Sequence, residues 1–120
     1  MNEFPTWTLA EANAALGEII RLTEEAQAQL REIDAVWGGL AFKKFDAIHG
    51  VATEDLIRAQ WAHRVAAVGA LPKGFFTVDF QSPDPETVFC WTCGETRIEH
   101  EHKIWETFTS RRRIADISQP

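Results

Sequence analysis

Two cysteines and two histidines lie close together in the last third of the chain, spaced as Cys90-x-x-Cys93 and His100-x-His102. Two thiolates and two imidazoles in such a stretch can hold a tetrahedral zinc ion. If the same residues instead form two strands joined by a tight turn, Cys90 and Cys93 point to opposite faces of a sheet. They could then neither share an ion nor form an unstrained disulfide. We favour the two strands, because apolar and polar residues alternate through this region.

A second candidate metal site keeps the strand intact. His100 and His102 would project from one face of it, and Glu106 follows just beyond. Two imidazoles and one carboxylate are a common ligand set for a divalent metal such as zinc. The alternative is a structural role, in which both histidines face the core and hydrogen-bond to a carboxylate or a carbonyl. The pattern leaves both interpretations open and favours the structural one.

A third candidate set is polar and extends over the same part of the chain: Asp79, Glu95, His102 and Arg111. Acids, a histidine and an arginine near a small sheet could bind an anionic or polar ligand. They could equally form an ion-pair network that fixes the C-terminal segment to the sheet. The sequence contains no nucleophile paired with a base, no glycine-rich phosphate loop and no dinucleotide-binding fingerprint. It therefore gives no positive support for catalysis, and the one cofactor it suggests is a divalent metal in the alternative site.

The composition indicates one globular domain spanning 1–120. The chain has 120 residues, of which 45% are hydrophobic, enough to bury a core. The formal net charge of −6 argues against a nucleic-acid-binding protein, which usually presents a basic face. The N-terminus does not resemble a signal peptide, and no apolar run approaches the roughly 20 residues that span a bilayer. We expect a cytoplasmic protein with reduced thiols and no membrane interaction.

Two amphipathic helices are predicted to precede the candidate sites and to pair antiparallel. Thr8 and Glu11 form a capping box at the start of the first helix, which we place at 8–37. Small or apolar residues recur along it at alternating spacings of three and four: Leu9, Ala12, Leu16, Ile19, Thr23, Ala26, Leu30, Ile33 and Trp37. This period is typical of a helix with one buried face. Thr53 caps a second, shorter helix at 53–69.

After the helices, a period of two predicts a small three-stranded antiparallel β-meander over 75–103, followed by a C-terminal segment over 104–120. A tight turn at Gly94-Glu95 would place Phe89 opposite His100. The turn before it would place Phe80 opposite Thr87 and Val78 opposite Phe89. In this register one face of the sheet is apolar and packs on the helices. That face holds Phe76, Val78, Phe80, Phe89, Trp91 and Ile98. The chain is therefore predicted to have an α+β fold.

The length of the first helix predicts self-association. It would be about 44 Å long and the second helix about 24 Å, so the shorter helix and the small sheet leave part of the apolar seam uncovered. Such a patch is larger than monomers usually leave in water. We expect a homodimer through the C-terminal half of the first helix. The expected interface residues are Ala26, Leu30, Ile33 and Trp37.

A further ordered set of short motifs runs through most of the chain. Its members are Thr8-Leu9-Ala10-Glu11-Ala12-Asn13, Val78-Asp79-Phe80, Cys90-Trp91, Gly94-Glu95, Ile98, His102, Phe108 and Arg111. This set resembles an uncharacterised bacterial family, domain of unknown function 2203 (DUF2203). The resemblance implies a helical pair with a terminal sheet and no established activity. Together with the residue patterns it favours a non-enzymatic, self-associating interaction or ligand-binding module. The alternative is a divalent-metal-binding protein that uses His100, His102 and Glu106, and after that a metal-dependent hydrolase.

Overall fold

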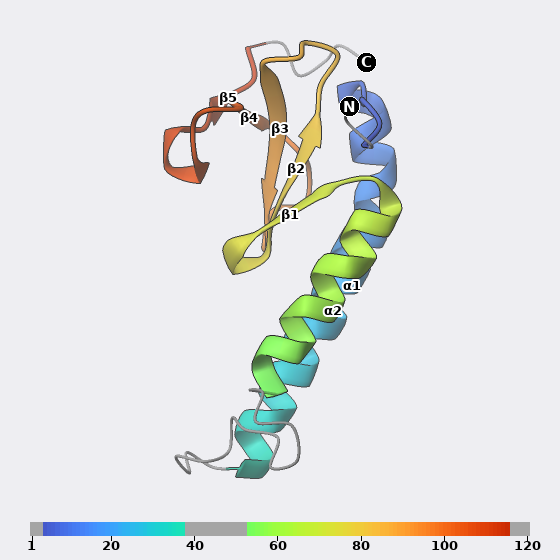
Figure 1. Ribbon diagram of the computed structural model, residues 1–120, viewed down its shortest axis with the longest axis vertical. Coiled ribbons are helices and arrows are strands. Elements are labelled where there is room, and N and C mark those ends of the chain that lie inside the picture. The colour runs from blue at the N-terminus through green and yellow to red at the C-terminus, as the bar shows by residue number, and fades with distance from the viewer. Residues whose placement is uncertain (1–3, 38–52, 116–120) are drawn as a thin grey trace.

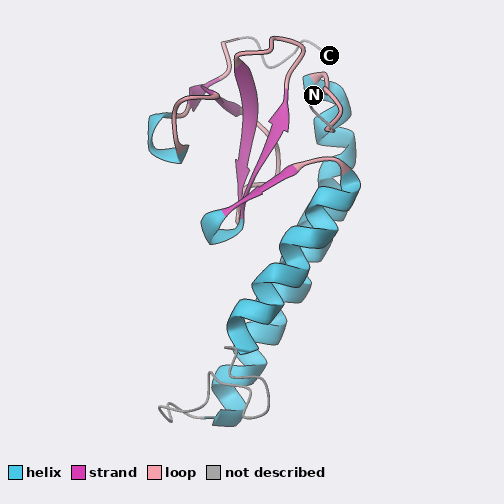
Figure 2. Ribbon diagram, viewed as in Figure 1, coloured by secondary structure: helices cyan, strands magenta, loops and turns pink. Residues whose placement is uncertain are grey.

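The computed structural model describes residues 4–37 and 53–115, with the side chains of the first helix described as far as Ile33. The chain forms two helices followed by an antiparallel sheet, which is the predicted α+β fold (Figures 1 and 2). Helix α1 spans Leu9–Trp37 and helix α2 spans Thr53–Val68, each within one residue of its predicted bounds. Helix α2 returns antiparallel to α1, and the sheet lies beside the N-terminal half of α1 (Figure 1).

Local hydrogen bonds start α1 where the sequence predicts. The amide of Thr8 donates to the carboxylate of Glu11 at 2.8 Å, and the amide of Glu11 donates to the hydroxyl of Thr8 at 3.1 Å. This capping box satisfies two amide groups that have no acceptor within the helix. Buried residues then recur along one face: Leu9, Ala12, Leu16, Ile19, Leu22, Thr23 and Ala26. The helix therefore presents a continuous, mostly apolar face to the rest of the chain.

A buried hydroxyl group joins the two helices. Thr23 donates to the carbonyl of Ile19 at 2.8 Å and accepts a hydrogen bond from the indole N–H of Trp61 at 2.9 Å. A buried indole usually needs such an acceptor, so the small polar residue in the seam has a structural role. At the surface, Arg64 and Glu25 form an ion pair at 2.9 Å between the same two helices.

The sheet contains five antiparallel strands in the order β1-β2-β3-β4-β5. The strands are β1 (Leu71–Lys73), β2 (Thr77–Gln81), β3 (Thr87–Thr92), β4 (His100–Lys103) and β5 (Arg112–Arg113). The prediction of three strands was wrong because it missed both edges. Strand β1 contains Pro72, which is tolerated at a sheet edge, and β5 lies within the expected C-terminal segment over 104–120. Both are too short to show alternation in the sequence.

One face of the sheet packs on the helices, as the alternation predicts. Its buried residues are Val78, Phe80, Phe89 and Trp91, and Ile98 from the connection between β3 and β4 joins the same core. Val78 lies opposite Trp91 rather than opposite Phe89, a shift of two residues that keeps every side chain on its predicted face. Asn13 of α1 accepts a hydrogen bond from the amide of Ile98 at 2.8 Å and donates to its carbonyl at 3.4 Å. The apolar face and this amide side chain together fix α1 to the sheet.

The register between β3 and β4 differs from the prediction and changes which residues share a face. Phe89 was expected opposite His100, whereas the structure pairs Phe89 with Glu101 and Cys90 with His100. A shift of one residue turns every side chain of a strand to the other face. The prediction that His100 and His102 face the core was therefore wrong. They lie on the outer face of the sheet, away from the helices.

Glu95 provides the physical reason for this register. Its amide donates to the carbonyl of Thr92 at 3.1 Å, and its carboxylate accepts a hydrogen bond from the amide of Thr92 at 2.9 Å. Gly94 has a φ of 98°, which glycine adopts readily. Because a side chain caps the end of β3, the chain leaves the ladder after Thr92 and rejoins it at His100. Residues 93–99 thus replace the predicted tight turn.

Candidate functional site

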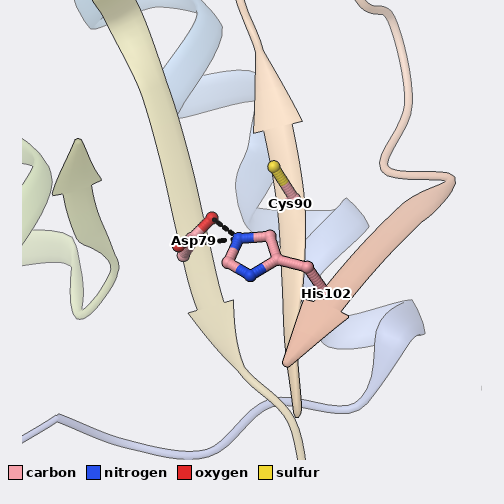
Figure 3. Close-up of side chains that lie close together, drawn as sticks. All are labelled: Asp79, Cys90 and His102. Atoms are coloured by element: carbon pink, nitrogen blue, oxygen red, sulfur yellow. Dashed lines mark hydrogen bonds and ion pairs between the residues drawn. The ribbon is translucent and has the colours of Figure 1, made fainter. Parts of the chain in front are cut away.

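Three side chains that could bind a metal or carry a proton meet on the outer face of the sheet (Figure 3). Asp79 lies on β2, Cys90 on β3 and His102 on β4. Asp79 and Cys90 are direct partners in the ladder. The exposed fractions of the three residues are 3%, 0% and 4%, respectively. One possible ligand atom from each lies within 4.8 Å of the other two, so the three strands assemble one buried cluster.

Hydrogen bonds fix the orientation of the His102 ring. Its Nδ1 lies 2.8 Å from the carbonyl oxygen of Lys103. Because a carbonyl only accepts, Nδ1 carries a hydrogen. Nε2 then faces both carboxylate oxygens of Asp79, each at 3.3 Å. When the ring is neutral and its hydrogen is on Nδ1, Nε2 turns a lone pair toward the Asp79 carboxylate, which is itself an acceptor. The contact therefore requires a second proton on the Asp79–His102 pair or a cation between the two side chains.

Burial dominates the electrostatics of this cluster. It raises the pKa of the Asp79 carboxyl above its ordinary value, although the charges of His102 and Lys73 oppose the shift. Burial, followed by the charge of Asp79, also raises the pKa of the Cys90 thiol to about 12, against the lowering effect of Arg111. At neutral pH Cys90 is therefore a protonated thiol and a weak nucleophile.

A second ion pair adjoins the cluster. Arg111 donates two hydrogen bonds to the carboxylate of Glu95, at 2.7 and 3.1 Å. Its guanidinium also lies over the ring of Phe108, 4.4 Å from the centroid, in a cation–π contact. Arg111 reaches the thiol of Cys90 as well, where it lowers the thiol pKa. The pKa of Cys90 is therefore influenced by both ion pairs, through Arg111 of the first and Asp79 of the second.

The structure separates the two cysteines. Cys93 packs against the core beside the helices, whereas Cys90 is buried with Asp79 on the outer face. In the sequence, Cys90 is close to Cys93, and its spacing gives no sign of a contact with Asp79. The missing signal was the register of β2 on β3, because direct cross-strand partners share a face.

The residues predicted as a metal site, His100, His102 and Glu106, have different partners in the structure. The carboxylate of Glu106 accepts a hydrogen bond from the amide of Lys103 at 2.7 Å. The Nδ1 atom of His100 lies 3.7 Å from the carboxylate of Glu95 and makes no hydrogen bond. Among residues 4–37 and 53–115, the one group of three with converging ligand atoms contains His102 but neither His100 nor Glu106.

Two members of the cluster, Asp79 and His102, line a pocket of about 400 Å³ on the outer face. The buried side chains of Asp79 and His102 form part of its base, and Lys73 and Glu106 bring one charge of each sign to its lining. Its apolar lining comes from Leu71, Phe75, Val88, Ile104 and Phe108. This volume lies within the roughly 300–1,000 Å³ typical of small-molecule sites.

Two consecutive phenylalanines beside the pocket adopt a strained backbone. Phe75 and Phe76 have φ values of 58° and 55°, in the left-handed region that bulky residues rarely occupy. The ring of Phe76 packs edge-on against Trp61, with 5.0 Å between the centroids. Phe75 lines the pocket and is 97% exposed. The core contact of Phe76 thus stabilises a turn that presents an aromatic ring to solvent at the pocket.

A family model described as "Uncharacterized conserved protein (DUF2203)" matches residues 5–114. No curated protein and no solved structure matches the chain. Neither α1 nor α2 combines the length and the hydropathy that a membrane-spanning helix requires. The comparisons therefore identify a family, and the chemistry of the site has to be inferred from its residues.

Proposed function

The chain belongs to the uncharacterized conserved family DUF2203, and we propose that it is a non-enzymatic ligand-binding module whose site is the pocket on the outer face of the sheet. The observation that carries this proposal is the buried Asp79–His102 pair at the base of a cavity with several apolar walls. Sites for small molecules combine such walls with a few placed polar groups. The pair would orient a ligand, and the walls would provide most of the affinity.

The lining indicates the chemistry of the ligand. An apolar or aromatic body would contact Phe75, Ile104 and Phe108, and a group that both donates and accepts hydrogen bonds would meet the Asp79–His102 pair. The exposed fractions of Phe75 and Ile104, 97% and 59%, are large for side chains of this kind, so a ligand could bury much apolar area. The protonated thiol nearby is a weak nucleophile, which supports binding rather than catalysis.

A bulky residue at Gly74 is expected to obstruct the pocket. Gly74 lines it, and a Cβ added there would meet nothing within 4 Å, so Gly74→Trp should fold. We expect metal-free wild-type protein to bind some members of a library of small aromatic fragments in ligand-observed NMR. Gly74→Trp should weaken the binding of these fragments by about tenfold or more, a loss of roughly 1.4 kcal/mol.

Gly17→Trp is the matched control for that experiment. Gly17 lies on the exposed side of α1, and a Cβ there also meets nothing within 4 Å. This variant should keep the affinity of wild-type protein for every fragment. Fragments that bind wild type and Gly74→Trp equally well would place the binding elsewhere and contradict the proposal, as would a library with no binder at all.

The long helix supports a second proposal, that the protein self-associates through the end of the helical pair that projects away from the sheet (Figure 1). On α1, Leu30 and Ile33 are only half-buried, and Leu56 at the start of α2 is 42% exposed. Ala26 is 4% exposed within the chain itself, so contacts between copies would centre on Leu30 and Ile33. The side chain of Trp37 lies outside the described residues.

Placing a charge at Leu30 should disrupt this association. Size-exclusion chromatography with light scattering should give twice the chain mass for wild-type protein at micromolar concentration and the chain mass for Leu30→Glu. A carboxylate is costly to bury in an apolar interface, which is why the dimer should dissociate. Gln29→Glu adds the same charge at an exposed neighbouring position and should remain a dimer. A wild-type monomer would contradict the proposal.

A further inference from the structure

We propose that Asp79, Cys90 and His102 form a binding site for a divalent transition-metal ion, best suited to zinc, at the base of the pocket. The site differs from the predicted set, with which it shares only His102. It goes beyond the proposed ligand binding, because it rests on the positions of three ligand atoms and not on the apolar lining.

The spacing of the Asp79–His102 contact fits two ligands of one ion. Nε2 lies 3.3 Å from each carboxylate oxygen. A charge-assisted hydrogen bond between such groups is usually shorter, about 2.7–2.9 Å. Two ligand atoms that each lie about 2.05 Å from a tetrahedral zinc ion are separated by about 3.3 Å. The observed separation therefore suits a shared ion better than a strong direct hydrogen bond.

The hydrogen on Nδ1 of His102 strengthens this assignment. The Lys103 carbonyl accepts that hydrogen at 2.8 Å, so the lone pair of Nε2 is directed at Asp79. Metal-binding histidines usually donate their other ring N–H to a carbonyl or a carboxylate in this way. A cation held between Nε2 and the carboxylate would also remove the mismatch between two facing acceptors.

The donor set favours zinc among the common divalent ions. One thiolate, one imidazole and one carboxylate suit a borderline-soft ion, whereas magnesium and calcium prefer oxygen ligands alone. Three protein ligands leave a fourth tetrahedral position open. Asp79 and His102 both line the pocket, so that position can face the cavity.

Arg111 would support the site through its effect on the Cys90 sulfur. It lies against the Cys90 thiol and is held in place by two hydrogen bonds to Glu95. The ion would bind the thiolate, and the proton of the thiol would leave to solvent. A guanidinium beside the sulfur stabilises the thiolate form that the ion needs.

Cobalt(II), which replaces zinc in tetrahedral sites and is coloured, provides the test. Protein without an affinity tag is treated with chelator and reducing agent and then titrated with cobalt chloride. We expect a thiolate-to-cobalt charge-transfer band that saturates at one ion per chain and disappears when zinc is added. Cys90→Ala should abolish the band, and Cys93→Ala, the matched cysteine control on the helix side of the sheet, should retain it.

Two results would overturn the site. One is the absence of the band from folded wild-type protein at saturating cobalt. The other is a band that survives Cys90→Ala but is lost in Cys93→Ala. His102→Gln, with folding verified by circular dichroism, should weaken cobalt binding at least tenfold, and unchanged affinity would also contradict the proposal. Fragment binding is measured on metal-free protein, so failure of the metal site and failure of the ligand pocket give different results.

Discussion

Replacing His102 with leucine is expected to lower the free energy of unfolding by about 3 kcal/mol. The side chain is buried, and its Nε2 lies 3.3 Å from both carboxylate oxygens of Asp79. Leucine has a similar volume but forms no hydrogen bond, so the carboxyl of Asp79 would stay buried without the partner that stabilises it. The measurement is urea-induced unfolding of metal-free protein at neutral pH, followed by tryptophan fluorescence.

A double variant separates loss of the pair from loss of packing. Adding Asp79→Val to His102→Leu should restore most of the stability, because no unpaired buried carboxyl remains. His63→Leu is the control, since His63 is exposed on α2 and its replacement should change stability by no more than about 0.5 kcal/mol. No recovery in the double variant would show that packing, and not pairing, makes His102 important.

Gly69→Ala is expected to destabilise the protein by about 2–4 kcal/mol. Gly69 follows α2 with a φ of 109°, a conformation that residues with a side chain rarely adopt. A Cβ there would lie 2.9 Å from Pro5 and 3.2 Å from the ring of Trp7. The Trp7 indole donates a hydrogen bond to the Gly69 carbonyl at 3.3 Å, which holds the N-terminal segment against Gly69. The added methyl group would push this segment away. Chemical denaturation of the variant beside wild type gives the difference.

Gly17→Ala reverses the expected sign and serves as the control. Gly17 lies within α1, and an added Cβ meets nothing within 4 Å. Alanine restricts the unfolded chain and favours the helix, so stability should rise by about 0.5–1 kcal/mol. Equal effects at Gly17 and Gly69 would mean that the close approach of Pro5 does not constrain the fold.

Signals carried by neighbouring residues predicted the helices correctly. Thr8 and Glu11 cap each other over three residues, and the spacing of three and four marks one face of α1 from Leu9 onward. These interactions form within one or two helical turns. They therefore depend little on what the rest of the chain does.

The apolar face of the sheet was also predictable, because a shift of two residues in strand register leaves every side chain on the same face. Val78 pairs with Trp91 rather than with Phe89, yet all three remain against the helices. The edge strands carried no comparable signal. Strand β1 is defined only by its pairing with β2, and β5 by its pairing with β4.

Tertiary structure alone decided the composition of the candidate site. The register of β4 on β3 decides which face His102 occupies, and a shift of one residue reverses it. Glu95 fixes this register by accepting a hydrogen bond from the Thr92 amide. Arg111, distant in sequence, holds the Glu95 carboxylate in place. The contact with Thr92 spans only three residues, but the ion pair with Arg111 joins positions 16 residues apart. Local sequence patterns cannot encode that ion pair, because it forms only when the two segments have met. The sequence by itself therefore determined the helices and the inner face of the sheet. The long-range contacts of Glu95 brought His102 to the outer face, where Asp79 and Cys90 lie.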